Sequence, residues 1–185
     1  MSPTSPAKSQ AEATPQQTAA DQAAAMKVEP TREHEWLRKF IGNWTYETEA
    51  AMEPGKPPVK MTGTENIRAV GEIWVQGEGT SQMPDGEPAI TMVTLGYDPI
   101  RKRFVGTWLG TMMAHLWIYD GELSADGRTL TLNSEGPSMS DFNKRANYRD
   151  VHEFKNDNLR TLTAFMQDEG GEWTQFMQMD YHRKK

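Results

Sequence analysis

Residues 36–46 read Trp-Leu-Arg-Lys-Phe-Ile-Gly-Asn-Trp-Thr-Tyr, and this pattern changes from helical to extended at Gly42. Before the glycine, the apolar side chains recur at the spacing that places them on one face of a helix. After it, Trp44 and Tyr46 alternate with polar residues, which is typical of a strand. The stretch predicts a short helix that starts after an N-cap at Thr31, ends with Gly42 in the left-handed conformation and continues directly into a strand.

Short strands, separated by turn signals at even intervals, fill the rest of the chain. Pairs such as Asp126-Gly127 and Gly170-Gly171 end one strand and begin the next. Parallel pairing would need crossover helices, and the sequence shows no helical pattern between the strands, so we expect an antiparallel up-and-down meander. Strands are predicted at about residues 44–49, 59–70, 89–97, 104–113, 115–123, 128–135, 147–155, 159–167 and 173–182, with one more that resumes at 73.

The size of this sheet favours closure. An open sheet of about ten strands would leave two edges unprotected, and closing it removes both. A helix of about three turns is too short to be stable alone in water, so it needs a surface to cover. The sequence therefore predicts an all-β, closed up-and-down antiparallel barrel of about ten strands, with the N-terminal helix capping one end.

Composition sets the domain organisation. Residues 1–30 are rich in Ser, Pro, Thr, Gln and Ala, so we expect a disordered low-complexity tail before a single barrel domain at residues 31–185. No apolar segment follows the start, which predicts a cytoplasmic protein as the sequence is written. A start further upstream would make it secreted or periplasmic.

Charge and motif content exclude several classes of function. A net charge of −6 and a pI near 5.3 argue against a nucleic-acid partner. The absence of about eighteen consecutive apolar residues argues against a membrane span, and the absence of cysteine excludes thiolate chemistry. No catalytic motif, metal-ligand spacing or cofactor loop is found, so no catalytic residue, metal or cofactor is predicted; a haem alternative would use His152 or His182. The sequence leaves the oligomeric state open.

Large aromatic and methionine side chains on strand faces are the candidates for a binding site. Six Trp and twelve Met are many for this length, and such side chains suit either a packed core or an adaptable cavity wall. The candidate barrel lining consists of Trp44, Tyr46, Trp108, Trp117, Tyr148, Asp150, His152, Met177, Met179 and Tyr181.

The strand at residues 148–154 is the most informative of these segments. Its apolar residues Tyr148 and Phe154 share one face with Asp150 and His152. If that face points inward, a carboxylate and an imidazole stand inside the barrel, where they could orient a ligand or move a proton. The opposite register would place charged residues inside instead, and the more apolar face favours the first arrangement.

Several motifs together resemble a known family. They are Glu-His-Glu-Trp-Leu-Arg-Lys-Phe-Ile-Gly-Asn-Trp (33–44), Gly-Tyr-Asp-Pro-Ile-Arg-Lys-Arg-Phe-Val-Gly-Thr-Trp (96–108), Leu-Trp-Ile-Tyr-Asp-Gly (116–121) and Tyr-Arg-Asp-Val-His-Glu-Phe (148–154). In this combination the chain, from about Glu33 to Lys185, is similar to the bacterial family known as domain of unknown function 1579. The resemblance implies a lipocalin-like barrel and no established catalytic residues. Residues 109–113, Leu-Gly-Thr-Met-Met, depart from the more polar segment usual in that family.

Three functions remain open on the sequence alone. The leading hypothesis is a barrel that binds a small apolar or aromatic ligand without catalysis. The alternative is an enzyme of the isomerase or hydrolase type that uses Asp150 and His152. The third is a solid barrel that binds another protein. An accessible interior would favour the first two, and a filled interior the third.

Overall fold

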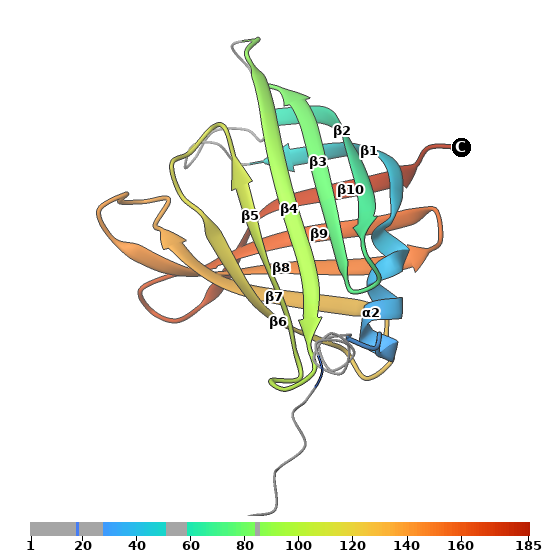
Figure 1. Cartoon of the computed structure of the whole chain (residues 1–185). Helices are drawn as coiled ribbons and strands as arrows, with labels where there is room; N and C mark the ends of the chain where they lie inside the picture. Colours follow the sequence, from blue (N-terminus) through green and yellow to red (C-terminus); the bar gives the residue numbers. More distant parts are fainter. Residues whose placement is uncertain (1–17, 19–27, 51–58, 84–85) are drawn as a thin grey trace, which may run out of the picture.

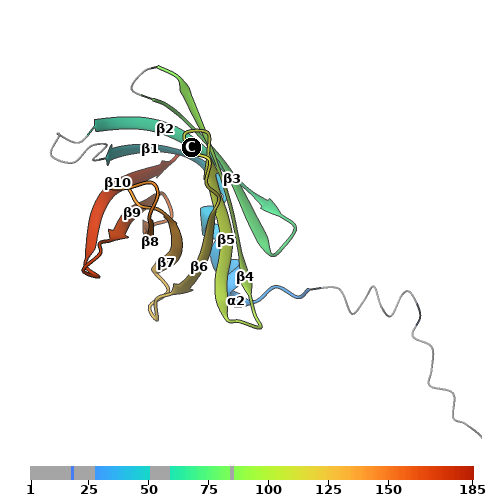
Figure 2. The ribbon, with the colours of Figure 1, turned by 90° about the vertical axis from the view of Figure 1, so that its left-hand side faces the viewer.

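The computed structural model describes residue 18 and residues 28–50, 59–83 and 86–185, and its strands close into one barrel (Figure 1, Figure 2). Each strand pairs antiparallel with the next, and β1 pairs with β10 to complete the ring. The predicted closed up-and-down antiparallel barrel is confirmed. The predicted disordered tail lies almost entirely outside the described residues. The strands are β1 (Gly42–Ala50), β2 (Val59–Val70), β3 (Trp74–Gln82), β4 (Pro88–Asp98), β5 (Arg103–Gly110), β6 (Trp117–Leu123), β7 (Thr129–Pro137), β8 (Arg145–Asn156), β9 (Leu159–Gln167) and β10 (Trp173–Arg183).

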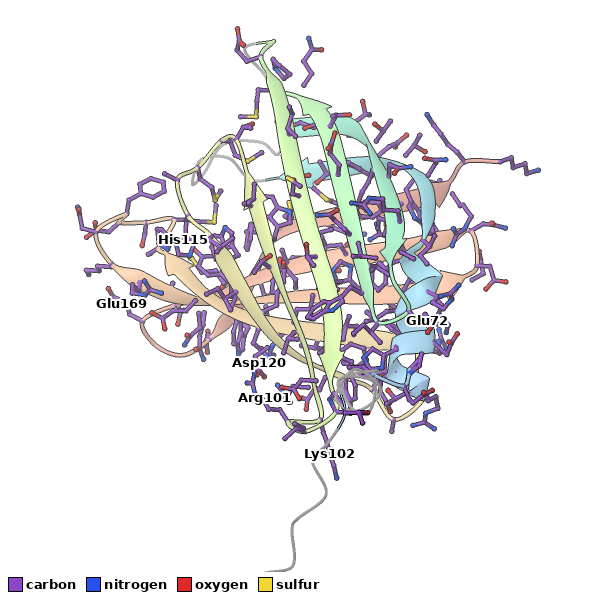
Figure 3. The ribbon with its side chains drawn as sticks, in the orientation of Figure 1. Glu72, Arg101, Lys102, His115, Asp120 and Glu169 are labelled. Carbon is purple, nitrogen blue, oxygen red and sulfur yellow. The ribbon has the colours of Figure 1, made fainter. Side chains whose placement is uncertain are left out.

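The alternating connections give the barrel two different ends. The turns after β2, β4, β6 and β8 lie at the same end as the start of β1, where the helix also lies; we call this the helix end. The turns after β5, β7 and β9 lie at the opposite end, which we call the far end. Figure 3 shows Glu72 beside the helix, and His115 and Glu169 at the far end.

The helix is shorter than the sequence predicts. It consists of α2 (Arg32–Leu37) and a single 3-10 turn, η1 (Arg38–Phe40). Thr31 starts it, with its backbone N–H donating to His34 Nδ1 at 2.9 Å. Ile41 is the C-cap of this turn and has an extended backbone (φ −60°, ψ 130°). The helix therefore ends at the predicted glycine: Gly42 follows the cap with a positive φ of +139°, a conformation that glycine adopts at little cost, and begins β1.

Hydrogen bonds to the barrel hold this helix in place. His34 is buried, and its Nε2–H donates to the backbone oxygen of Tyr97 on β4 at 3.0 Å. Trp36 Nε1–H donates to the oxygen of Gly127 in the β6–β7 turn at 2.7 Å. The Arg183 guanidinium on β10 donates to backbone oxygens of η1 and of the residue that follows it. The helix is thus fastened to three separate parts of the ring. No helix that the structure describes has the length and apolar character needed to cross a membrane.

Strand alternation directs one face of every strand into the barrel. Inward residues from the helix end to the middle of the barrel, together with three residues of the helix, form one buried apolar cluster. Burying these apolar side chains is the main force that closes the ring. The cluster consists of Trp36, Leu37, Phe40, Trp44, Tyr46, Ile67, Val75, Leu95, Phe104, Tyr119, Leu130, Leu132, Phe154, Leu162 and Tyr181.

Candidate ligand-binding interior

The interior at the helix end is filled with side chains. Trp44 is fully buried, and its Nε1–H donates to the backbone oxygen of Phe40 at 2.8 Å. The Phe40 ring meets Phe154 edge-on, with 5.0 Å between the ring centroids. Because these rings contact one another and the helix, this end forms the packed floor of the barrel.

A buried ion pair crosses this floor. Arg160 on β9 is 1% exposed and donates to the carboxylate of Glu65 on β2. The guanidinium also lies over the Tyr181 ring, 3.6 Å from its centroid, an attractive arrangement for a cation. Burial raises the pKa of Glu65 more than the attraction of Arg160 lowers it. Arg160 Nε is buried without a hydrogen-bond partner among the described residues, so the cation is held by its charge partner and by aromatic faces.

His152 belongs to the same floor. Its Nδ1 accepts from Arg160 Nη1 at 3.5 Å, and its ring meets Phe40 edge-on at 5.3 Å. Burial, helped by the charge of Arg160, lowers the pKa of His152 to about 3. His152 is therefore a neutral side chain of the packed floor. His182, the other histidine of the haem alternative, lies exposed on the outer face of β10, and no three metal-ligating side chains lie together in the part of the chain that the structure describes.

Asp150 lies on the inner face of β8, between the floor and the far end. Its Oδ2 accepts a hydrogen bond from the Tyr119 hydroxyl at 2.6 Å. The residue as a whole is half-buried, and the protein around its carboxyl group desolvates that group. Burial raises the pKa of Asp150 to about 6, against a smaller lowering by the Tyr119 hydrogen bond. The preferred register of residues 148–154 is confirmed, because Tyr148, His152 and Phe154 are all buried.

Aromatic and methionine side chains dominate the inner face at the far end. Trp117 packs edge-on against Tyr148, with 4.6 Å between centroids. A Cβ added to Gly136 would come within 2.5 Å of the Trp117 ring, so glycine makes room for that ring. Trp108 lies opposite Trp117 in the β5–β6 register, and both keep part of their surface exposed. This end is thus less completely packed than the floor.

The structure divides the ten predicted lining residues into two groups. All ten point into the barrel. Three are buried in the floor around Arg160: Trp44, His152 and Tyr181. The other group faces the middle or the far end, where Tyr46 and Tyr148 are buried and the rest are half-buried: Trp108, Trp117, Asp150, Met177 and Met179.

Asp150 and His152, the predicted acid–base pair, lie on the same face of β8 but have different hydrogen-bond partners. Asp150 is bound by Tyr119, whereas His152 is bound by Arg160. Within the described residues no hydrogen bond links the two. The geometry does not favour a proton relay between them.

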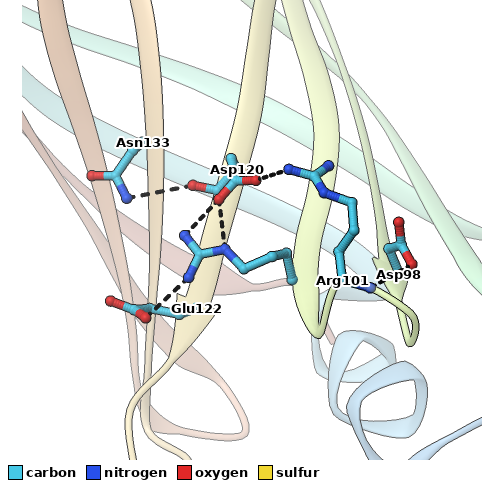
Figure 4. Close-up of polar contacts among 6 residues, drawn as sticks. Asp98, Arg101, Asp120, Glu122 and Asn133 are labelled. Atoms are coloured by element: carbon cyan, nitrogen blue, oxygen red, sulfur yellow. Dashed lines mark hydrogen bonds and ion pairs between the residues drawn. The ribbon is translucent and has the colours of Figure 1, made fainter.

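The outer face carries a network of ion pairs at the β4–β5 and β5–β6 junctions (Figure 4). Asp120 accepts from Arg101 and from Arg103, the latter at 2.5 Å, and Arg103 also reaches Glu122 at 3.1 Å. Asp98 accepts from the backbone of the intervening turn. These charges are largely solvent-exposed and contribute little to stability. Because these charged side chains already pair with one another, the barrel interior is the better candidate for a ligand-binding site.

Two hollows also lie on the outside of the barrel. One, of about 710 Å³, is lined mainly by polar outward residues of β1–β4 such as Thr64, Asn66 and Glu78. The other, of about 470 Å³, lies over β6–β10, where the Arg149 guanidinium stacks on Trp173 at 4.1 Å. Both are open to solvent over polar sheet surface, a poorer setting for an apolar ligand than the barrel interior.

The closed ring, its capped floor and its aromatic inner wall define a lipocalin-like barrel protein. The chain belongs to the family described as protein of unknown function (DUF1579), whose model matches residues 29–183. It is similar in structure to Rv2717c from M. tuberculosis (13% identity, TM-score 0.62, covering 85% of this chain and 100% of that one). It is also similar to the S-type phycobiliprotein lyase CPES from Guillardia theta (13% identity, TM-score 0.58, covering 84% and 94%). At this identity the similarities show a shared fold. No curated protein matches the sequence significantly.

Sequence reasoning missed Glu65, Arg160 and Tyr119. The signal that identified Asp150 was available for the first two: each is a charged residue on an otherwise apolar strand face, Met61–Ile67 for Glu65 and Arg160–Met166 for Arg160. Tyr119 alternates with Trp117 on β6 and was left out of the lining.

Proposed function

We propose that this protein binds one small apolar or aromatic molecule inside the barrel, entering from the far end, and that it does so without catalysis. The observation that carries the proposal is the uneven packing of the inner face. Most inward residues at the helix end are buried beneath the helix, whereas Trp108, Trp117, Met177 and Met179 keep accessible surface.

The chemistry of the accessible inner face supports an apolar occupant. Its side chains are mostly aromatic rings and methionines, which adapt to irregular shapes and gain free energy when a ligand displaces water from them. The attachment of the helix to three parts of the ring argues against entry at the floor. Asp150 and the Tyr119 hydroxyl supply one polar contact that could orient the bound molecule.

An enzymatic function has less support. The floor buries His152 and holds it neutral beside Arg160, so it is not placed to accept a proton from a molecule in the accessible part of the barrel. A nucleophile activated by a neighbouring base is the usual requirement for hydrolysis, and none of the described inner-face contacts provides one.

Adjacent positions on β10 give a matched test. Met177 points inward and Gln178 points to solvent. We expect Met177→Lys to weaken the binding of an apolar fluorescent dye by about tenfold or more, because a charge would be desolvated in the binding space. Gln178→Lys adds the same charge outside and should leave dye binding unchanged. Thermal melts of both variants establish that each is folded.

Two results would refute the proposal. One is the absence of any bound small molecule by native mass spectrometry together with no saturable dye binding by the wild type. The other is equal loss of dye affinity in Met177→Lys and Gln178→Lys, which would place the dye on the outer surface.

A further inference from the structure

We propose that the ligand of the barrel carries a cationic nitrogen, such as a protonated amine, and that the Asp150 carboxylate binds this group. The inference rests on the proposed function and specifies its ligand. It comes from the charges that the fold places inside the ring and from the way these charges are paired.

The fold pairs the other inward charges but leaves Asp150 unpaired. Among the described strand residues whose side chains point inward, the acidic ones are Glu65 and Asp150, and the permanently charged basic ones are Arg160 and Arg183. Arg160 is committed to Glu65 and to the Tyr181 face, and Arg183 donates to backbone oxygens at the helix end. Asp150 is therefore left without a cation, and a buried unpaired carboxylate is costly unless a partner arrives.

Asp150 is also the inward charged group that lies away from the helix end, since Glu65 and Arg183 both lie opposite Trp44. Arg160 is 1% exposed, whereas Asp150 keeps accessible surface. The Tyr119 hydroxyl occupies one acceptor position of the carboxylate. An ionised carboxylate has about four lone-pair sites, so it can accept further hydrogen bonds from a ligand.

The side chains around this carboxylate suit a ligand that carries a cationic group on an otherwise apolar molecule. Tyr148 lies two residues away on the same face of β8, and the Trp117 ring packs against it. Met177 and Met179 lie on β10 across β9 from Asp150. Aromatic faces attract cations, and the thioethers provide an adaptable apolar wall.

The protonation of Asp150 gives the inference a pH signature. Because burial raises the pKa of Asp150 to about 6, the ionised carboxylate that binds the cation predominates above that pH and is lost below it. The other titratable groups that face this part of the interior are Glu65 on β2 and four tyrosines, Tyr46 on β1, Tyr119 on β6, Tyr148 on β8 and Tyr181 on β10. Burial raises the pKa of all four tyrosines above 10, so they stay neutral throughout this range. His152, on the same strand, also stays neutral.

Three probes that share one ring system test the inference: naphthylmethylamine, naphthylmethanol and naphthoate. We expect the wild type to bind the amine about tenfold more tightly than the alcohol at about pH 8, and the carboxylate most weakly. The preference for the amine should fall as the pH drops through about 6. Binding is measured by tryptophan fluorescence and by calorimetry.

Asp150→Asn should bring the amine to the affinity of the alcohol. The matched control is Asp180→Asn, which removes a carboxylate from the outer face of β10 and should keep the amine preference. If Asp150→Asn does not fold, Tyr119→Phe replaces it. Loss of the Tyr119 hydroxyl raises the pKa of Asp150 further, so the midpoint of amine binding should move to higher pH.

The outcomes separate this inference from the proposed function. Equal binding of amine and alcohol by the wild type would overturn the cationic ligand and leave the apolar binding function standing. Tighter binding of naphthoate would overturn it in favour of an anion site at Arg160. An unchanged pH midpoint in Tyr119→Phe would overturn the assignment to Asp150. Failure of the folded protein to bind any of the three would overturn the inference together with the function on which it rests.

Discussion

The ion pair between Arg160 and Glu65 predicts a strongly non-additive pattern of stability. Removing one member of a buried pair leaves the other charge without compensation, which costs about 3–5 kcal/mol. Arg160 also lies 3.6 Å from the Tyr181 ring centroid, and a desolvated contact of this kind contributes about 2 kcal/mol. We therefore expect Arg160→Met to lose about 5–7 kcal/mol of unfolding free energy and Glu65→Leu about 3–5 kcal/mol.

The double variant should be more stable than the sum of these losses implies. With both charges gone, neither has to be buried alone, and a methionine and a leucine can fill similar volume. We expect a coupling energy of about 2–3 kcal/mol. Urea unfolding followed by tryptophan fluorescence and far-ultraviolet circular dichroism measures all four proteins of the cycle.

A surface pair provides the matched control. Lys144 and Glu169 lie 2.7 Å apart, but their side chains are 59% and 85% exposed. The same cycle on this pair should give a coupling of under about 1 kcal/mol. Additive losses for Arg160 and Glu65, within about 0.5 kcal/mol, would refute the argument because they would show that the two charges do not meet in the barrel floor.

Further predictions concern the middle, the far end and the helix. Because the folded-state pKa of Asp150 is raised to about 6 from 3.8, its contribution to stability is complete below about pH 4 and is lost as the pH rises through about 6. The unfolding free energy of Asp150→Asn, measured relative to that of the wild type, should therefore rise by about 2 kcal/mol as the pH rises from about 4 to about 8. A difference in urea midpoints that does not change with pH would contradict this. Gly136→Ala places a Cβ against Trp117 and should cost about 1–3 kcal/mol in thermal melts while shifting tryptophan emission; an unchanged melt and spectrum would show that the ring has room to move. His34→Ala removes a buried acceptor for the helix start and a link to β4, so amide hydrogens of α2 should exchange about tenfold faster; unchanged exchange would show that the other attachments suffice.

The order and extent of the strands were predictable from local sequence. Turn signals such as Asp126-Gly127 mark where each strand ends, and alternation between apolar and polar residues shows which face turns inward. The face of β8 that points inward was predictable because it carries an apolar residue at each end of the 148–154 segment, Tyr148 and Phe154. The end of the helix at Gly42 was also predictable, but the 3-10 form of its last turn was not, because α-helical and 3-10 turns satisfy the same sequence pattern over so few residues.

The pairing of interior charges depended on the closed ring. Glu65 on β2 and Arg160 on β9 are 95 residues apart, and β1 and β10 lie between them in the sheet. Local periodicity places each on an inner face but does not show which charge meets which. The same limit applied to Tyr119, whose bond to Asp150 spans β7. Which end of the interior is filled depends on where the helix is attached, and that information is also non-local.

The seam between the first and last strands has a consequence for how the chain is made. Because β1 finds its second neighbour only in β10, at residues 173–183, a nascent chain still on the ribosome has two unpaired strand edges until its final segment emerges. Such edges invite pairing with other chains, and contacts between distant residues form slowly. Synthesis therefore passes through a vulnerable interval that ends when the last strand docks, and a product truncated before residue 173 would be an open sheet prone to aggregate.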